Sequence, residues 1–376
     1  MKLAMLRLPA AWATVAAVTF GPAIVPDALS GVVAGLLFLW LLGIIFWAAF
    51  GVVHEAEEIA ERLGEPFGTL ILTLSIVIIE VALISAVMLG AKDVPTLGRD
   101  TMFAVLMIVL NGVVGLGLLV GGLRHHQQSF NLQGASSYLA VTIPLAVIAL
   151  VLPNFTTSSS TGTLSTVQSA LFSALTIALY GIFLWLQTGR HRAFFQPVGT
   201  GAEQAPEASS SATPPGTPMP HADDDSTPLW RHVVLLLANI LPIVILSKSL
   251  ATLLDAGIEA TGAPIALSGI IIAMIVFTPE GISALRAVAA NELTRAVNLC
   301  LGAATSTLGL TVPAVLLIGL LTGQAVVLGL SAANMVLLAM TLVLNALTFS
   351  GNRTTMLEGA VHLSLFAVFL VLVFSP

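Results

Sequence analysis

Eleven apolar runs follow one another along this chain, and each is close to the roughly 20 residues that a helix needs to cross a bilayer. They cover residues 9–26, 28–53, 66–90, 100–123, 135–153, 163–187, 229–254, 264–289, 296–321, 325–349 and 356–375. Charged residues make up 9% of the chain, whereas soluble domains carry roughly 25%. The sequence therefore predicts an all-α polytopic membrane protein with about 11 transmembrane helices embedded in a lipid bilayer.

The distribution of Lys and Arg predicts how these helices are oriented. If the N-terminus is cytoplasmic, only Lys92, Arg99 and Lys248 of the 13 basic residues fall on the outer side. Cytoplasmic loops of membrane proteins carry an excess of basic residues. We therefore expect a cytoplasmic N-terminus and a C-terminus outside.

One long polar segment divides the chain. Residues 196–228 are rich in Pro, Ser and acidic residues, and they predict a disordered cytoplasmic linker. The predicted organisation is an N-terminal transmembrane helix (1–27), one five-helix repeat (28–195), the linker and a second five-helix repeat (229–376). Two acidic segments, 54–65 and 223–225, are interpreted as a solvated interfacial helix and a solvated run, and whether either regulates function stays open.

Two carboxylates lie inside apolar runs. Glu80 lies 14 residues beyond Pro66, and Glu280 lies 16 residues beyond Pro264. Each is therefore about 21–24 Å along its helix, near the middle of the hydrocarbon. A charge at that depth costs at least ~2.5–3.5 kcal/mol and usually marks an ion or proton pathway. Because the predicted topology runs the two helices in opposite directions, the pair predicts inverted repeats with a shared midplane site.

Polar residues in the next predicted span of each half could complete that site. Asn111 interrupts an apolar run, and Ser306 lies in a cluster of hydroxyl residues before Pro313. Carboxylate, amide, hydroxyl and backbone oxygens are the ligands of hard cations. With no cation bound, desolvation and mutual repulsion favour protonation of both carboxylates, and a cation displaces those protons. Glu80 and Glu280 are thus predicted to bind a metal cation or protons, without any cofactor.

Three hydroxyls near the carboxylates admit two interpretations. Thr278 and Ser75 could face the cation, or each could donate a hydrogen bond back to its own helix. Ser283 lies three residues beyond Glu280, on a neighbouring helix face. Thr278 and Ser283 are kept as candidate site residues.

Several motifs resemble a known family. They are "HEAEEIAERLGEPFGTLILTLSIVIIEVALISAV", "LRHHQQSFN", "TPEGISALRAVAANELTRAVNLCLGAATSTLGLTVPAVL" and "NRTTMLEGAVHL". They are similar to ChaA-type calcium/sodium–proton antiporters of the CAX branch of the calcium/cation antiporter superfamily. The resemblance implies a bacterial inner membrane protein with one extra helix and two inverted five-helix repeats. It implies that Glu80 and Glu280 are the exchange carboxylates, with Asn111 and Ser306 in the following helices.

The motifs depart from the family at one point. CAX proteins typically read Gly-Asn-x-x-Glu, whereas Ile76–Val77 and Val276–Phe277 stand before these two glutamates. Fewer side-chain oxygens make monovalent Na⁺ or K⁺ a real alternative, since Ca²⁺ prefers 6–8 ligands. The resulting prediction is a Ca²⁺/H⁺ antiporter, with a Na⁺ or K⁺/H⁺ antiporter as the alternative.

Other function classes find less support in the sequence. A cation channel would need a filter segment, and no such segment repeats along the chain. Neither a His-Glu-x-x-His element nor a nucleotide-binding loop occurs, so neither enzymatic activity nor the use of ATP is expected. The net charge of -6 does not indicate a basic surface for binding nucleic acid. The oligomeric state stays open.

Overall fold

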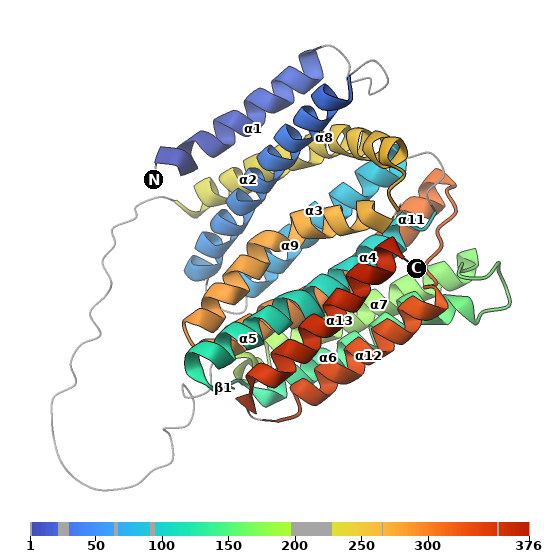
Figure 1. Cartoon of the computed structure of the whole chain (residues 1–376). Coiled ribbons are helices and arrows are strands. Elements are labelled where there is room, and N and C mark those ends of the chain that lie inside the picture. The colour runs from blue at the N-terminus through green and yellow to red at the C-terminus, as the bar shows by residue number, and fades with distance from the viewer. Residues whose placement is uncertain are drawn as a thin grey trace, which may run out of the picture.

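A computed structural model describes residues 2–21, 30–63, 67–90, 95–196, 228–264, 266–351 and 353–375. Long helices lie side by side in one bundle, with the N- and C-termini at opposite ends (Figure 1). Among the described residues, eight helices are long and apolar enough to cross a membrane, and three shorter apolar helices accompany them. The prediction of an all-α polytopic membrane protein is confirmed.

The first half of the chain contains one extra helix followed by a series of five spans. Its elements are α1 (Lys2–Phe20), α2 (Gly31–Leu63), α3 (Phe67–Gly90), α4 (Leu97–Met107), the π-helical turn η2 (Ile108–Val113), α5 (Val114–His125), β1 (Gln128–Ser129), α6 (Leu132–Ala146), η3 (Val147–Val151), η4 (Leu152–Asn154), α7 (Thr166–Thr188) and η5 (Arg192–Phe195).

The second half repeats this order. Its elements are α8 (Leu229–Thr261), α9 (Ala266–Ala289), α10 (Leu293–Ser306), the π-helical turn η6 (Thr307–Thr311), α11 (Val312–Thr322), α12 (Ala332–Thr348), β2 (Arg353–Thr354) and α13 (Met356–Phe374). Helices α2 and α8 both have 33 residues, and α3 and α9 both have 24. In each half the next span is broken by a π-helical turn.

The helix boundaries follow local sequence signals. Ser165 caps α7 with a capping box that includes Gln168, and Asn131 caps α6 through its side-chain oxygen. The outer face of α7 carries large exposed apolar side chains, among them Leu171 and Trp185. Such a face suits hydrocarbon because lipid accepts apolar side chains and excludes unpaired backbone groups.

The two halves interlock at the centre of the bundle. Helices α2 and α8 pack together, and α1 lies against both on one side of the bundle (Figure 1). Helix α3 contacts η6 and α11, whereas α9 contacts α4, η2 and α5. Each glutamate-bearing helix therefore also packs against the π-interrupted span of the other half.

A short antiparallel pair marks one end of the bundle. Strand β1 follows α5 and pairs with β2, which follows α12, in the register Gln128–Thr354 and Ser129–Arg353. The two loops share one face of the protein, as the predicted topology requires. We call it the β1–β2 face, and its location in the cytoplasm stays a prediction.

Two predicted spans differ in their bounds from the helices that the structure forms there, and most of the predicted linker is not described. The apolar run 325–349 is helical only from Ala332, because residues 324–331 form no regular secondary structure and Leu328 and Gly329 donate backbone hydrogen bonds to Gly162 O. The run 9–26 forms a helix that ends at Phe20. The predicted linker lies outside the described residues except for its two ends, as do residues 223–225.

The prediction of a solvated interfacial helix at 54–65 is wrong for the face that carries Glu55, and residues 64–65 lie outside the described residues. These residues continue α2 to Leu63, and Glu55 is buried. Its Oε2 lies 2.8 Å from His232 Nδ1, and its Oε1 lies 4.0 Å from the Arg7 guanidinium. The segment therefore joins α1, α2 and α8 through a buried charge cluster, because α1 and α8 cover the face of α2 on which Glu55 lies.

The contact between α5 and α13 depends on glycine. A Cβ atom on Gly359 would lie 2.8 Å from Gly115 O, and neither backbone can yield without moving a helix. Small residues allow such close approach in membranes. We expect Gly359→Ala to lower the free energy of unfolding by about 1–3 kcal/mol, as overpacking does. Thermal unfolding in detergent measures it, with Gly181→Ala as control because a Cβ atom there would meet no described residue within 4 Å. Equal melting temperatures would contradict the assigned packing.

Candidate cation and proton site

Glu80 lies in a fully enclosed position on α3. Its Oε2 accepts hydrogen bonds of 3.0 Å from the hydroxyls of both Thr307 and Thr311, which begin and end the turn η6. Its Oε1 is buried and has no hydrogen-bond partner among the described residues. The π-helical turn brings both hydroxyls to one carboxylate oxygen and leaves the other free. Such turns occur frequently at functional sites.

Glu280 lies on α9 directly after Pro279 and is 8% exposed. Its Oε2 is likewise buried without a partner in the described part of the chain. Helix α9 packs against α3, the helix that carries Glu80. Because Pro279 has no N–H, the carbonyl of Ile275 lacks its usual helical partner. The structure thus brings the two glutamate-bearing helices together from the two halves of the chain.

Two buried carboxylates without compensating cations are costly. Each retains an oxygen that no described donor satisfies, and charges inside a membrane normally find partners. Protons or a bound cation can remove that penalty, and either would occupy the same oxygens. The arrangement can therefore exchange one for the other.

The candidate residue Asn111 in the first half forms its hydrogen bonds with α12 and α13. Asn111 lies in η2 and is fully buried, but its Nδ2 donates to Thr341 Oγ1 at 2.8 Å. Its Oδ1 lies 3.1 Å from His362 Nδ1, and His362 Nε2 lies 3.0 Å from Thr348 Oγ1. The amide is therefore engaged with α12 and α13, and no hydrogen bond joins it to either carboxylate within the described residues. Its predicted part in cation binding stays a prediction.

The remaining candidate hydroxyls bond mostly to their own helices. Ser306 donates to Ala303 O at 3.0 Å, and Thr278 donates to Met274 O at 2.6 Å. Ser75 does the same with Ile71 O, which favours the backbone-bonded interpretation for Thr278 and Ser75. Ser283 is half-buried on α9 just beyond Glu280.

Sequence reasoning overlooked Thr311 and noted Thr307 only as part of a polar cluster. The signal was present in "TLGLT", where two hydroxyl residues four apart flank a glycine. Position 309 between them requires a glycine, since a Cβ atom there would lie 2.7 Å from Tyr180 Cβ on α7. Tyr180 therefore packs directly on the turn that presents both threonines to Glu80.

Comparison with known proteins identifies the family. The sodium/calcium exchanger protein family matches residues 33–189 and 231–375, one match on each five-helix unit. A putative ionic transporter (y4hA) of Sinorhizobium fredii is 40% identical over 91% of this chain and 89% of its own length. The sodium-potassium/proton antiporter ChaA of Escherichia coli is 39% identical over 92% and 90%.

The fold is also that of a solved structure. Native YfkE superposes with a TM-score of 0.71 at 16% identity, over 100% of this chain and 99% of that one. The resemblance inferred from the motifs is confirmed. The chain belongs to the sodium/calcium exchanger protein family and is a multi-pass membrane antiporter that exchanges cations for protons.

Proposed function

We propose that the protein exports Ca²⁺ in exchange for protons at the Glu80–Glu280 pair, by alternating access, without chemical conversion of a substrate. The supporting observation is that each glutamate retains one buried oxygen without a partner in the part of the chain that the structure describes. We place the N-terminus in the cytoplasm and the C-terminus outside the bacterial inner membrane, in accord with the bias of basic residues.

Charge balance favours a divalent cation. Two protons or one Ca²⁺ each neutralise both carboxylates, so the site is neutral in either loaded state. The oxygens available around the pair include the hydroxyls of Thr307 and Thr311 and the freed carbonyl of Ile275. Together with both carboxylates and water they can approach the 6–8 ligands that Ca²⁺ prefers.

A monovalent cation is the second candidate, and two observations favour it. Ile76–Val77 and Val276–Phe277, which stand where CAX proteins have Gly-Asn, are buried and apolar, so the amide oxygen typical of CAX proteins is missing. One relative at 39% identity is named a sodium-potassium/proton antiporter. With Na⁺ or K⁺ bound, one carboxylate could keep its proton and preserve neutrality.

Flux in everted vesicles without ATP tests the proposal. An imposed pH gradient, acidic inside, should drive uptake of ⁴⁵Ca²⁺, and a protonophore should stop it. Parallel assays with ²²Na⁺ and ⁸⁶Rb⁺ decide between the two candidates. Cation flux that follows voltage and ignores the pH gradient would instead indicate a channel.

The two threonines should matter for cation affinity. Hydrogen bonds to charged groups contribute ~1.5–3 kcal/mol each, so Thr307→Val or Thr311→Val should raise KM about tenfold or more. The reason is that Glu80 loses a donor that orients it, and the cation loses a hydroxyl oxygen. Thr322→Val on the same span is the matched control, because Thr322 is exposed and bonds only to Ile318 O. Unchanged KM in both site variants would contradict this role.

A further inference from the structure

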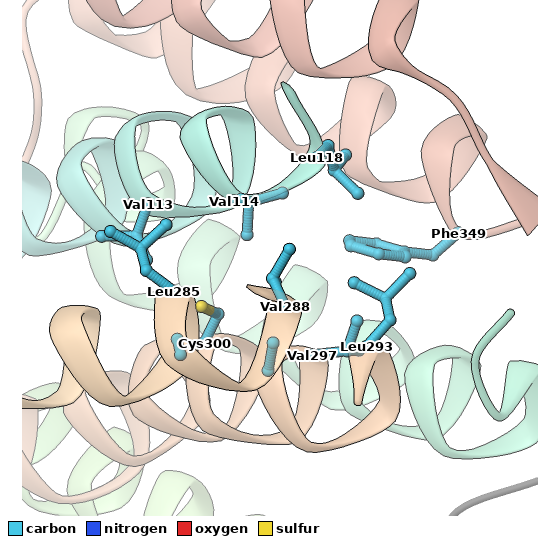
Figure 2. Close-up of a pocket in the computed structure, with 12 residues that line it drawn as sticks. Val113, Val114, Leu118, Leu285, Val288, Leu293, Val297, Cys300 and Phe349 are labelled. Carbon is cyan, nitrogen blue, oxygen red and sulfur yellow. The ribbon is translucent and has the colours of Figure 1, made fainter. Parts of the chain in front are cut away.

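A narrow cavity lies between α5, α9 and α10, and its lining on α9 begins one helical turn beyond Glu280. Its walls are apolar, and Val113, Leu118, Leu285, Val288, Cys300 and Phe349 line it together with neighbouring aliphatic and glycine residues (Figure 2). The cavity measures about 20 Å³, room for about one water molecule. Cavities with such walls remain dry because a water inside finds no hydrogen-bond partners.

The cavity extends from the exchange site toward the β1–β2 face. On α9 it begins at Ala284, one turn beyond Glu280, and continues to Val288 near the end of the helix at Ala289. Cys300 lines it from α10. The deep end of the cavity therefore lies one helical turn from Glu280 on α9.

Hydrogen bonds lie beside the outer end of this cavity, where α9 ends. Gln128 of β1 is buried, and its Nε2 donates to Val288 O at 2.9 Å and to Asn291 Oδ1 at 3.0 Å. Nearby, His125 Nε2 lies 3.2 Å from Ala289 O. The loop after α5 is thus joined directly to the end of α9, and we call these contacts the Gln128 clasp.

We propose that this cavity is the closed route by which cations reach Glu280 from the β1–β2 face. The inference rests on the proposed function of the glutamate pair. A hydrated cation cannot enter a dry apolar constriction, and hydrophobic constrictions close pores by dewetting. Separation of α5 from α9 would break the Gln128 clasp, wet the cavity and expose Cys300 together with Glu280.

Cys300 is the single cysteine of the chain, so it reports on this route without engineering. A charged, membrane-impermeant methanethiosulfonate reagent should modify it during turnover in everted vesicles, where the cytoplasmic face is exposed. We expect modification about tenfold faster than in right-side-out vesicles, and loss of transport as the dry constriction is blocked. Transport by Cys300→Ala should not respond to the reagent. Equal or faster modification in right-side-out vesicles, or none in either, would overturn the proposal.

Two variants sharpen the test. Val288→Asn should wet the cavity and Gln128→Leu should break the clasp, so both should speed modification of Cys300 in everted vesicles about tenfold. Val336→Asn, at an exposed position of α12, should leave the rate unchanged. Unchanged rates in both cavity variants, when folded, would also overturn the route. This result is separable from the proposed function, because labelling of Cys300 does not require Glu80, and exchange that survives loss of either glutamate would refute that function alone.

Discussion

Glutamine in place of Glu80 or Glu280 should abolish proton-driven cation exchange while the protein remains folded. Glutamine preserves the shape of the side chain and removes its charge, so it can neither release a proton nor neutralise a cation. One unit charge at 4 Å contributes about 4 kcal/mol at an effective dielectric constant of 20. Its loss corresponds to roughly a thousandfold weaker cation binding.

The measurement is uptake of ⁴⁵Ca²⁺, ²²Na⁺ and ⁸⁶Rb⁺ into everted vesicles under a fixed pH gradient. Glu259→Gln is the matched control, because Glu259 is exposed at the end of α8 and the substitution is chemically identical. Glu80→Asp and Glu280→Asp should retain measurable exchange with a raised KM, since the charge persists but is withdrawn by one methylene. Melting temperatures near that of the wild type show that the variants are folded.

Glu80→Gln and Glu280→Gln should reduce cation exchange to the same degree. Each has a buried oxygen without a partner among the described residues, and the helices that carry the two glutamates pack against each other between the halves. If Glu280→Gln exchanged cations at the rate of the wild type while Glu80→Gln did not, one carboxylate would suffice. The shared site would then be refuted.

The sequence alone predicted the fold class and the glutamate pair, because both depend on strong local signals. A carboxylate inside a long, mostly apolar run is conspicuous, and hydropathy predicts the depth of Glu80 and Glu280 in their helices. The predicted opposite directions of α3 and α9 then imply that the two meet near the midplane. No contact between side chains was needed for that inference.

The hydrogen-bond partners could not be predicted in the same way. Thr307 and Thr311 contact a residue more than 220 positions away, and they do so through a π-helical turn that periodicity does not reveal. The direction of Asn111 depends on His362, which approaches from the last helix. The depth of a polar residue can be read from hydropathy, but its rotation toward one neighbour is decided by tertiary packing.

Alanine in place of Glu55 should strongly destabilise the protein, although Glu55 lies on α2 and is not one of the candidate site residues. Glu55 is flanked by Arg7 of α1 and His232 of α8, and the side chains of all three are at most 11% exposed. Removal of one partner from a buried ion pair costs about 3–5 kcal/mol, because the remaining charge keeps its desolvation penalty. Unfolding in detergent, followed by melting temperature and denaturant titration, measures the loss.

Glu259→Ala is the control, since that side chain is exposed and should change stability by no more than about 0.5 kcal/mol. The variant should also loosen α1. Trp12 Nε1 donates to Ala238 O at 3.0 Å, so this contact and the charge cluster are two of the described polar attachments between α1 and α8. Faster proteolysis near the N-terminus of Glu55→Ala than of Glu259→Ala would report that loosening.

A combined replacement separates the charge cluster from mere loss of packing. Arg7→Met, Glu55→Met and His232→Leu together remove every charge of the cluster and largely preserve volume. Apolar replacement of a buried ionic group is often neutral or stabilising, so the triple variant should recover most of the stability that Glu55→Ala loses. If the triple variant were less stable than Glu55→Ala, an uncompensated charge could not be the cause. The buried ends of α1, α2 and α8 would then depend on contacts other than this ion pair.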